Sequence, residues 1–126
     1  IPWSTVRVAV GHGTTRGGYA AAARLLTDHP WLTGLVCGND RMAMGAYDAI
    51  REQGLRVRDD VAVIGIDDQE LIADQLHPAL TTVALPFEEM GQVAASHLLA
   101  LMEGEEVPAE TLLPGQIIRR SSAWHP

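Results

Sequence analysis

Two polar side chains follow stretches of the sequence that have the length and composition of buried β-strands. Asn39 comes after the apolar run Leu35–Cys37, and Asp67 comes directly after the run Val61–Ile66. In an open α/β sheet, ligands bind at the edge formed by the carboxyl ends of the strands. An ionised aspartate accepts hydrogen bonds, whereas an asparagine both donates and accepts them, and this combination suits a polyhydroxylated ligand such as a sugar. We therefore predict that Asn39 and Asp67 bind a ligand.

These residue types also have a purely local use, because Asn and Asp are preferred at the N-caps of helices. Asn39 and Asp40 precede one predicted helix, and Asp67 and Asp68 precede another. From spacing alone, a helix cap and a ligand contact are equally good interpretations of these positions.

A glycine-rich segment, Gly11–Gly18, lies between a predicted strand and a predicted helix, the order found in dinucleotide-binding loops. The match is poor, because the third glycine of the G-x-G-x-x-G pattern would fall at Arg16. A Walker A loop needs a lysine, and the chain contains none. We interpret the segment as a tight turn that uses the backbone freedom of glycine.

The remaining reactive residues form no catalytic or metal-binding pattern. The five histidines are scattered, and no G-x-S-x-G motif occurs. The single cysteine, Cys37, ends an apolar stretch, which favours a buried, unreactive thiol and excludes an internal disulfide. We therefore expect no catalysis, no metal and no cofactor.

The charge balance argues against nucleic-acid binding by this chain alone. Its 126 residues carry 16 acidic and 9 basic side chains, which gives a formal net charge of −7. All nine basic residues are arginine. Non-specific affinity for DNA comes mainly from Lys and Arg that neutralise phosphates. The 47% share of hydrophobic residues indicates a globular domain, and neither a membrane span nor a secretory signal is visible. Because the chain begins with Ile1 rather than methionine, we expect it to be part of a longer protein.

Short β-branched runs alternate with longer helical patterns, which predicts an α/β fold with a Rossmann-like parallel sheet covered by helices. The predicted strands are 6–10, 35–37, 61–66, 80–85 and 111–119, the last broken by Pro114 and Gly115. The predicted helices are a helix from Thr14 or Thr15 to Asp28, one over 41–53, a short one capped by Asp67 and Asp68 that ends at Leu76, and a long one over 86–102. Residues 120–126 are expected to form a tail.

Two predicted helices carry more apolar residues than packing against one face of a sheet would bury. In the helix over 41–53, Met44 and Tyr47 form a stripe beside the expected core positions, which indicates either an oligomer contact or a wide core-facing surface. The long helix has its own apolar stripe, made of Met90, Val93, Ala94, Leu98, Leu101 and Met102. We expect that stripe to be buried by dimerisation, by exchange of the helix between chains, or by altered docking.

Four linked segments resemble, in order and spacing, the C-terminal part of LacI/GalR-family transcriptional regulators. They are Gly-Asn-Asp-Arg-Met-Ala-Met-Gly-Ala at 38–46, Val-Ala-Val-Ile-Gly-Ile-Asp-Asp at 61–68, Pro-Ala-Leu-Thr-Thr-Val at 78–83 with Pro-Phe-Glu-Glu-Met-Gly at 86–91, and Leu-Leu-Pro at 112–114 with Arg-Arg-Ser at 119–121. The resemblance covers essentially the whole chain. Periplasmic sugar-binding proteins of the ribose type share the first two segments, whereas the others are similar to the regulators.

The resemblance implies a non-enzymatic, cytoplasmic regulator with an N-terminal helix-turn-helix domain and a two-lobed core of the type I periplasmic-binding-protein kind. Residues 1–126 would be the C-terminal lobe of that core, with a long helix that packs on the other lobe. The DNA-binding domain and most of the N-terminal lobe would then be absent from this chain. The implied partners are a small sugar-like effector, a second copy in a homodimer, and DNA only through the absent domain, with no membrane contact.

The resemblance also assigns roles to individual residues. Asn39 and Asp67 would bind hydroxyl groups of the effector. Where relatives often carry an aromatic residue, this chain has Gly13, so His12 and Arg16 become further ligand-binding candidates. The implied dimer contacts are Met44, Tyr47, Leu71 and Leu76. The chain near Leu85 and at 117–119 would cross between the lobes.

Two other functions remain open at this point. A sugar-binding component of an exported ABC transporter would have the same fold and the same polar edge. A Rossmann-type enzyme is a third, more distant alternative.

Overall fold

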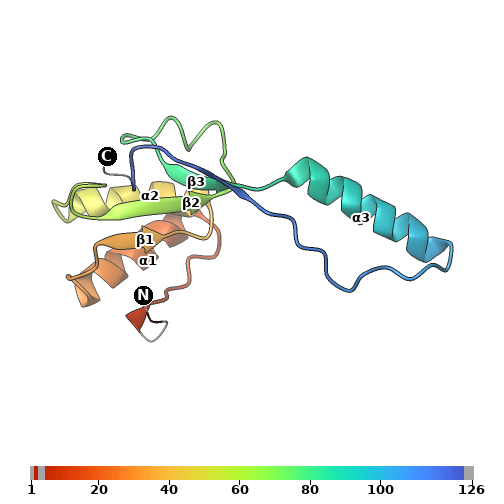
Figure 1. The fold of residues 1–126 in the computed structure, drawn as a ribbon. Coiled ribbons are helices and arrows are strands. Elements are labelled where there is room, and N and C mark those ends of the chain that lie inside the picture. Colours follow the sequence, from red (N-terminus) through yellow and green to blue (C-terminus); the bar gives the residue numbers. More distant parts are fainter. Residues whose placement is uncertain (1, 3–4, 124–126) are drawn as a thin grey trace.

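A four-stranded sheet forms the centre of the computed structural model, which describes residue 2 and residues 5–123. The strands β1 (Gly34–Val36), β2 (Ala62–Ile66) and β3 (Thr81–Ala84) are parallel, and β4 (Gln116–Ile118) pairs antiparallel with β3. The strand order is β1-β2-β3-β4 (Figure 1). This architecture confirms the predicted α/β fold with a parallel sheet, except that β4 runs antiparallel to its neighbour.

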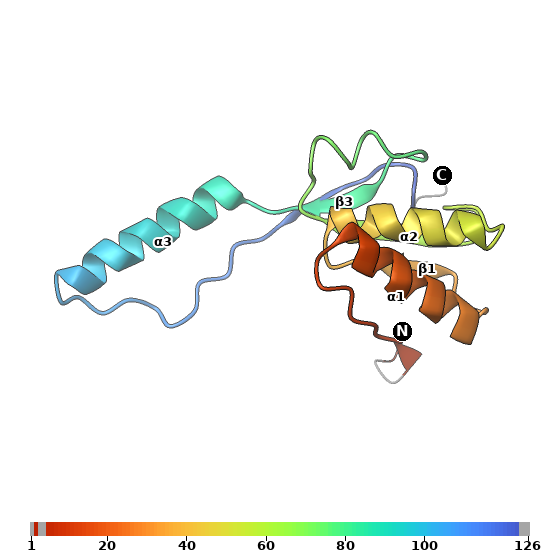
Figure 2. The same cartoon turned by 180° about the vertical axis from the view of Figure 1, so that it is seen from behind.

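Two helices, α1 (Thr15–Asp28) and α2 (Asp40–Glu52), cover one face of the sheet (Figures 1 and 2). Each begins at a predicted cap: the Thr14 hydroxyl accepts a hydrogen bond from the Gly17 amide at 3.0 Å. The side-chain Oδ1 atom of Asn39 accepts one from the Met42 amide at 2.9 Å. These bonds satisfy backbone donors that a helix leaves unpaired at its first turn.

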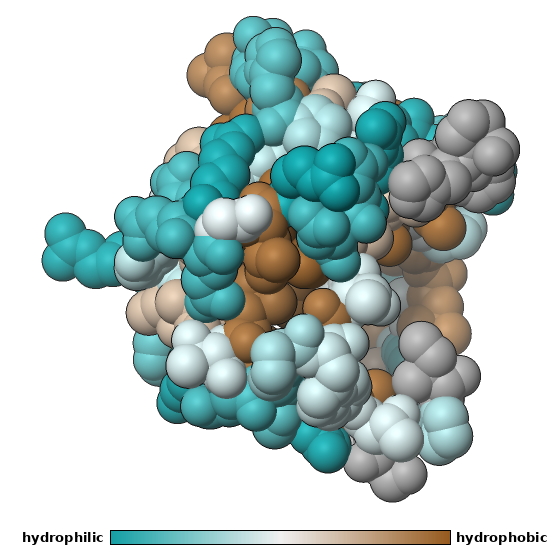
Figure 3. Space-filling view, turned by 90° about the vertical axis from the view of Figure 1, so that its left-hand side faces the viewer, coloured by the Kyte–Doolittle hydropathy of each residue, from teal (hydrophilic) through white to brown (hydrophobic). Residues whose placement is uncertain are grey.

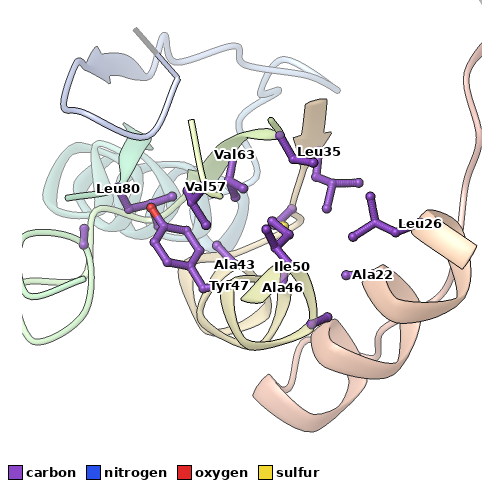
Figure 4. Close-up of a cluster of buried hydrophobic side chains, with 14 residues drawn as sticks. Ala22, Leu26, Leu35, Ala43, Ala46, Tyr47, Ile50, Val57, Val63 and Leu80 are labelled. Carbon is purple, nitrogen blue, oxygen red and sulfur yellow. The ribbon is translucent and has the colours of Figure 1, made fainter. Parts of the chain in front are cut away.

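The hydrophobic core lies between these helices and the sheet (Figure 4). Tyr47, Ile50, Val63 and Leu80 are each 0% exposed, and the Tyr47 hydroxyl donates a hydrogen bond to the Pro78 carbonyl at 2.8 Å. At the end of the molecule opposite the long helix α3, hydrophilic side chains surround a hollow in which apolar side chains are visible (Figure 3). Polar surface residues therefore surround the apolar side chains at this end without covering them completely.

The backbones of α1 and α2 lie in close contact where glycines leave out a side chain. A Cβ atom at Gly18 would collide with the backbone of Met42. A Cβ atom at Gly45 would collide with the Thr15 carbonyl oxygen and the Tyr19 amide nitrogen. Part of the glycine-rich segment thus serves helix packing, beyond the tight turn that we predicted.

The predicted strand over 6–10 is wrong, because these residues have no regular structure. They line a groove beside β1 without forming a ladder with it, and the side chains of Val8 and Val10 are 74% and 70% exposed. The neighbouring edge strand β1 is only three residues long, and Val8 and Val10 have no face to pack against, so little burial would repay the entropy of ordering this segment as a strand.

Two other boundaries differ from the prediction. Residues 70–75 form turns rather than a helix, and Asp67 and Asp68, with positive φ angles of 110° and 54°, do not have the extended conformation of an N-cap. The last strand begins at Gln116, after Pro114 and Gly115, so residues 111–115 lie outside it. Of the predicted tail, residues 124–126 lie outside the described part of the chain.

The helix α3 (Phe87–Met102) extends away from the sheet and the other helices (Figures 1 and 2). None of its residues is buried, and Leu98, Leu101 and Met102 are 59%, 55% and 74% exposed. The helix follows the predicted boundaries closely, whereas burial of its apolar stripe stays a prediction. Within the part of the chain that the structure describes, no helix has the length and apolar character needed to cross a membrane.

The helix crossing makes a testable prediction about stability. We expect Gly45→Ala to lower the free energy of unfolding by about 1–3 kcal/mol, because the added methyl group forces two backbones apart. Gly91→Ala is the matched control, since Gly91 lies in α3 with open space around it. This second change should leave stability unchanged or raise it by at most about 1 kcal/mol through helix propensity. Urea denaturation measures both, and equal losses would contradict the packing role.

Candidate functional site

Asn39 holds together two elements at the carboxyl edge of the sheet. Its Nδ2 atom donates a hydrogen bond to the Gly13 carbonyl at 3.0 Å, while its Oδ1 atom caps α2 through the Met42 amide. The side chain is half-buried. Asn39 is therefore a helix cap, and it also fixes the turn before α1 against the start of α2.

Asp67 does not act as a helix cap, although both interpretations were open for it. Its backbone amide donates to the Val83 carbonyl at 2.9 Å, and its φ angle of 110° turns the chain sharply at the end of β2. The half-buried carboxylate accepts one long hydrogen bond, from Gln69 Nε2 at 3.5 Å. Its other lone pairs are available to a ligand.

Asp40, the first residue of α2, is 0% exposed and organises the edge from inside. Its Oδ1 atom accepts a hydrogen bond from the Thr82 hydroxyl at 2.6 Å, and its Oδ2 atom accepts one from the Gln69 amide at 2.8 Å. Burial raises the pKa of Asp40, and these two hydrogen bonds counteract part of that rise. Its position at the positive end of the helix dipole also favours the charged form.

The buried carboxylate explains a glycine inside the most apolar strand. A Cβ atom at Gly65 would collide with the carboxylate of Asp40 and press on Leu80. From the sequence we interpreted Asp40 only as a cap. An isolated glycine within a strand indicates that another group approaches the backbone closely. Gly65 was therefore the feature of the sequence that indicated a close neighbour here, and the structure identifies that neighbour as Asp40.

Three consecutive amides fix the backbone that carries Asp67. The amides of residues 67, 68 and 69 donate to the Val83 carbonyl, to the Thr82 hydroxyl at 3.4 Å, and to the Asp40 carboxylate. A non-glycine residue at positive φ costs about 1–3 kcal/mol. The three hydrogen bonds offset this cost at Asp67 and Asp68, so the backbone that carries the Asp67 side chain is fixed within the protein.

The two predicted ligand-binding residues lie at the same edge, connected through Gln69. The Gln69 side chain donates to Asp67 and accepts from Arg41 Nε at 3.4 Å, while its amide bonds to Asp40, the neighbour of Asn39. His12 and Arg16 are exposed in the turn before α1 and in its first turn. His12 precedes Gly13, whose carbonyl is bonded to Asn39, so both candidates belong to this edge.

The four predicted dimer contacts have different surroundings. Leu71 is 89% exposed on the loop between β2 and β3, and Met44 and Leu76 are half-buried. Tyr47 is wholly inside the core, where burial raises the pKa of its hydroxyl to about 12. Its ring belongs to the hydrophobic core, so Tyr47 does not contribute to the surface that a second copy could contact.

Sequence reasoning did not single out the residues that tie the chain end to this edge. The Ser122 hydroxyl, which is buried, donates to the Val63 carbonyl at 2.6 Å and accepts from the Thr81 amide at 2.8 Å. Arg120 forms an ion pair with Asp68 at 2.8 Å. The Arg-Arg-Ser segment at 119–121 was the available signal for Arg120, but we gave Arg120 no role, and no pattern in the sequence indicated Ser122.

The single cysteine is poorly suited to act as a catalytic nucleophile. Cys37 is 7% exposed, and burial raises the pKa of its thiol to about 12. Among residue 2 and residues 5–123, no group of three or more His, Cys, Asp or Glu side chains is placed to hold a metal ion. What the described edge can do is hold a small ligand by hydrogen bonds.

Comparison with known protein families and sequences finds consistent relatives. The model of the periplasmic binding protein-like domain matches residues 4–123. The lactose operon repressor of Rhizobium radiobacter is 37% identical over 109 residues, covering 86% of this chain and 96% of that protein. The lactose operon repressor of Escherichia coli (strain K12) is 34% identical, with 92% of this chain and 32% of that protein covered. The HTH-type transcriptional regulator MalR of Streptomyces coelicolor is 42% identical, with 90% and 33% covered.

The chain therefore spans about a third of the length of several curated relatives that it matches. These relatives are named as regulators or repressors rather than as enzymes, which agrees with the expectation of a non-catalytic protein.

Solved structures show the same relationship. The lac repressor dimer bound to operator and the anti-inducer ONPF has a TM-score of 0.82 and 34% identity, covering 91% of this chain and 40% of that chain. A LacI family transcriptional regulator from Arthrobacter sp. FB24 in complex with lactose has a TM-score of 0.75 and 35% identity, with 91% and 44% covered. One from Enterococcus faecium with bound ribose has a TM-score of 0.78 and 31% identity, with 98% and 45% covered.

The burial of Cys37 predicts an unreactive thiol. At about pH 8 a thiol with this pKa is almost wholly protonated, so a thiol reagent such as DTNB should not react with the folded chain, but should react fully in guanidinium chloride. Val36→Cys in a Cys37→Ala background is the control, because Val36 is 77% exposed and its replacement should react at once. Rapid reaction of native Cys37 would contradict the buried site.

The raised pKa of Asp40 predicts a pH-dependent stability. The carboxyl group of Asp40 binds its proton more tightly in the folded chain than in the unfolded chain. The contribution of this proton to the free energy of unfolding is therefore full below the ordinary aspartate pKa and falls as the pH rises through the pKa of Asp40 in the folded chain. The stability of wild type relative to Asp40→Asn should therefore be greatest near about pH 3.5 and decrease toward about pH 7. Urea unfolding at several pH values measures this, with Asp74→Asn on the exposed loop as control. A difference that grows with pH would refute it.

Proposed function

Because the chain belongs to the periplasmic-binding-protein-like family and is homologous to LacI-family transcriptional regulators, we propose that it senses a small effector and forms dimers in such a regulator. Effector binding at the edge that carries Asn39 and Asp67 then changes the affinity of the whole protein for operator DNA. The observation that carries this proposal is the Asp67 carboxylate, which keeps free acceptor capacity on a backbone that the amides of residues 67–69 fix by donating to Val83, Thr82 and Asp40.

The effector that best suits this edge is a sugar or a related polyol or nucleoside. A carboxylate that accepts from two neighbouring hydroxyl groups fits such a ligand. The Asn39 amide already uses one donor and one acceptor within the protein, which leaves its second N–H and a second lone pair for the ligand. His12 and Arg16 are further contacts at the same edge. Lactose and ribose in the two related structures belong to the same chemical class.

The negative charge of the chain places DNA recognition elsewhere in the protein. With 16 acidic and 9 basic residues, the chain repels a phosphate backbone. We therefore assign operator contacts to a separate helix-turn-helix domain of a cytoplasmic protein. Residues 1–126 act as the C-terminal lobe, and the apolar stripe of α3 packs on the other lobe.

A dimer would use surface residues on α2 and on the loop between β2 and β3. Leu71 is the most exposed of them, and Met44 and Leu76 expose part of their side chains. A large apolar side chain with 89% exposure is suited to burial by a second copy. In the same regulator, effector binding would use the start of this loop and pairing would use later residues of the same loop together with α2.

A single substitution tests the effector site. In the full-length protein, Asp67→Ala should weaken effector binding by about 10- to 100-fold, because hydrogen bonds to a charged group are lost. A thermal-shift panel of sugars that includes lactose and ribose finds the effector, and operator release in a gel-shift titration measures the loss. Asp28→Ala is the control, because Asp28 is exposed at the end of α1 and belongs neither to the proposed effector edge nor to the proposed dimer surface. Unchanged operator release by Asp67→Ala would overturn the assignment, and dimerisation should stay intact in both variants.

A further inference from the structure

Arg120 contacts both ends of the loop that separates β2 from β3. Its Nη1 atom lies 2.8 Å from Asp68 Oδ1 and donates a hydrogen bond to the Leu80 carbonyl at 3.0 Å. The side chains of Arg120 and Asp68 are only 22% and 27% exposed. Solvent therefore screens this ion pair less than an ordinary surface pair.

The backbone of Arg120 is itself fixed to the start of β3. Its amide donates to the Thr81 hydroxyl at 3.0 Å, and that hydroxyl donates to the Arg120 carbonyl at the same distance. The next two amides, of Ser121 and Ser122, both donate to the Ala79 carbonyl. The guanidinium thus projects from a rigid base and can hold the loop rather than follow it.

We propose that Arg120 is a positioning residue for the effector site, an inference that rests on the function proposed above. By joining Asp68 to Leu80, it closes the loop and keeps Asp68 at a positive φ angle. Asp67 is the preceding residue, and its carboxylate has only one long hydrogen bond of its own. The direction in which that carboxylate points is therefore set by the backbone that Arg120 secures.

The position of Arg120 in the chain gives this contact a second consequence. Arg120 follows β4 by two residues, on the segment that returns from α3. A shift of that segment would pull the guanidinium away from Asp68. The order of the effector-binding loop is thereby coupled to the position of β4.

Hydrogen exchange of the full-length protein tests the proposal without a ligand. In Arg120→Met, amides of residues 67–80 should exchange about tenfold faster or more, while amides of α1 and α2 keep their protection. Arg120→Lys should restore part of the protection, because one ammonium group can make both contacts. Asp68→Asn combined with Arg120→Met should add little to the single change. Arg24→Met, an exposed site on α1, is the charge-matched control.

A second arm measures sugar affinity with lactose and ribose as probes. A probe that binds wild type should bind Arg120→Met about tenfold more weakly or worse, and Arg120→Lys in between. Unchanged exchange in residues 67–80, or loss of protection spread over the whole chain, would overturn the positioning role. Local loss of protection with unchanged sugar affinity would overturn the link to Asp67. If Asp67→Ala left operator release unchanged, the proposed function would fail, whereas the exchange result would still decide whether Arg120 closes the loop.

Discussion

A carboxylate without partners is costly inside a protein, and the burial of Asp40 determines how the rest of the site is built. The charge of Asp40 is stabilised because the residue lies at the N-terminus of α2. The Thr82 hydroxyl and the Gln69 backbone amide also donate hydrogen bonds to its two oxygens. The same carboxylate requires Gly65 in β2, since any side chain at that position would occupy its space. One buried group thus sets the spacing of a helix, two strands and a loop.

The residues proposed to meet the effector depend on this buried group. Asp67 lies at a backbone angle that few residues other than glycine adopt, and it stays there because neighbouring amides have fixed acceptors. The cost of this conformation is met during folding, so little ordering is needed when the ligand binds. Asn39 follows the same logic, because its structural hydrogen bonds fix the amide group that faces the edge.

The sequence predicted elements well where local chemistry and burial agree. The caps at Thr14 and Asn39 and the apolar run before Asp67 gave helices and a strand close to those observed. Residues 6–10 have strand-like composition, but a strand also needs a partner edge and a face to bury, which composition does not reveal. Residue type could not separate Asp40 from Asp67, because the difference between them lies in burial and in a positive φ angle, and both depend on contacts between distant segments.

Because the helix α3 is long and projects from the sheet, a small rearrangement of the sheet moves its far end over a large distance. Its 16 residues span about 24 Å at 1.5 Å per residue, and its two connections leave the sheet side by side where Ala84 pairs with Gln116. A rotation of about 10° at that base displaces the far end of the helix by about 4 Å. The short antiparallel ladder between β3 and β4 is therefore the pivot of this rotation. Its stiffness determines how far the end of α3 moves when the sheet rearranges.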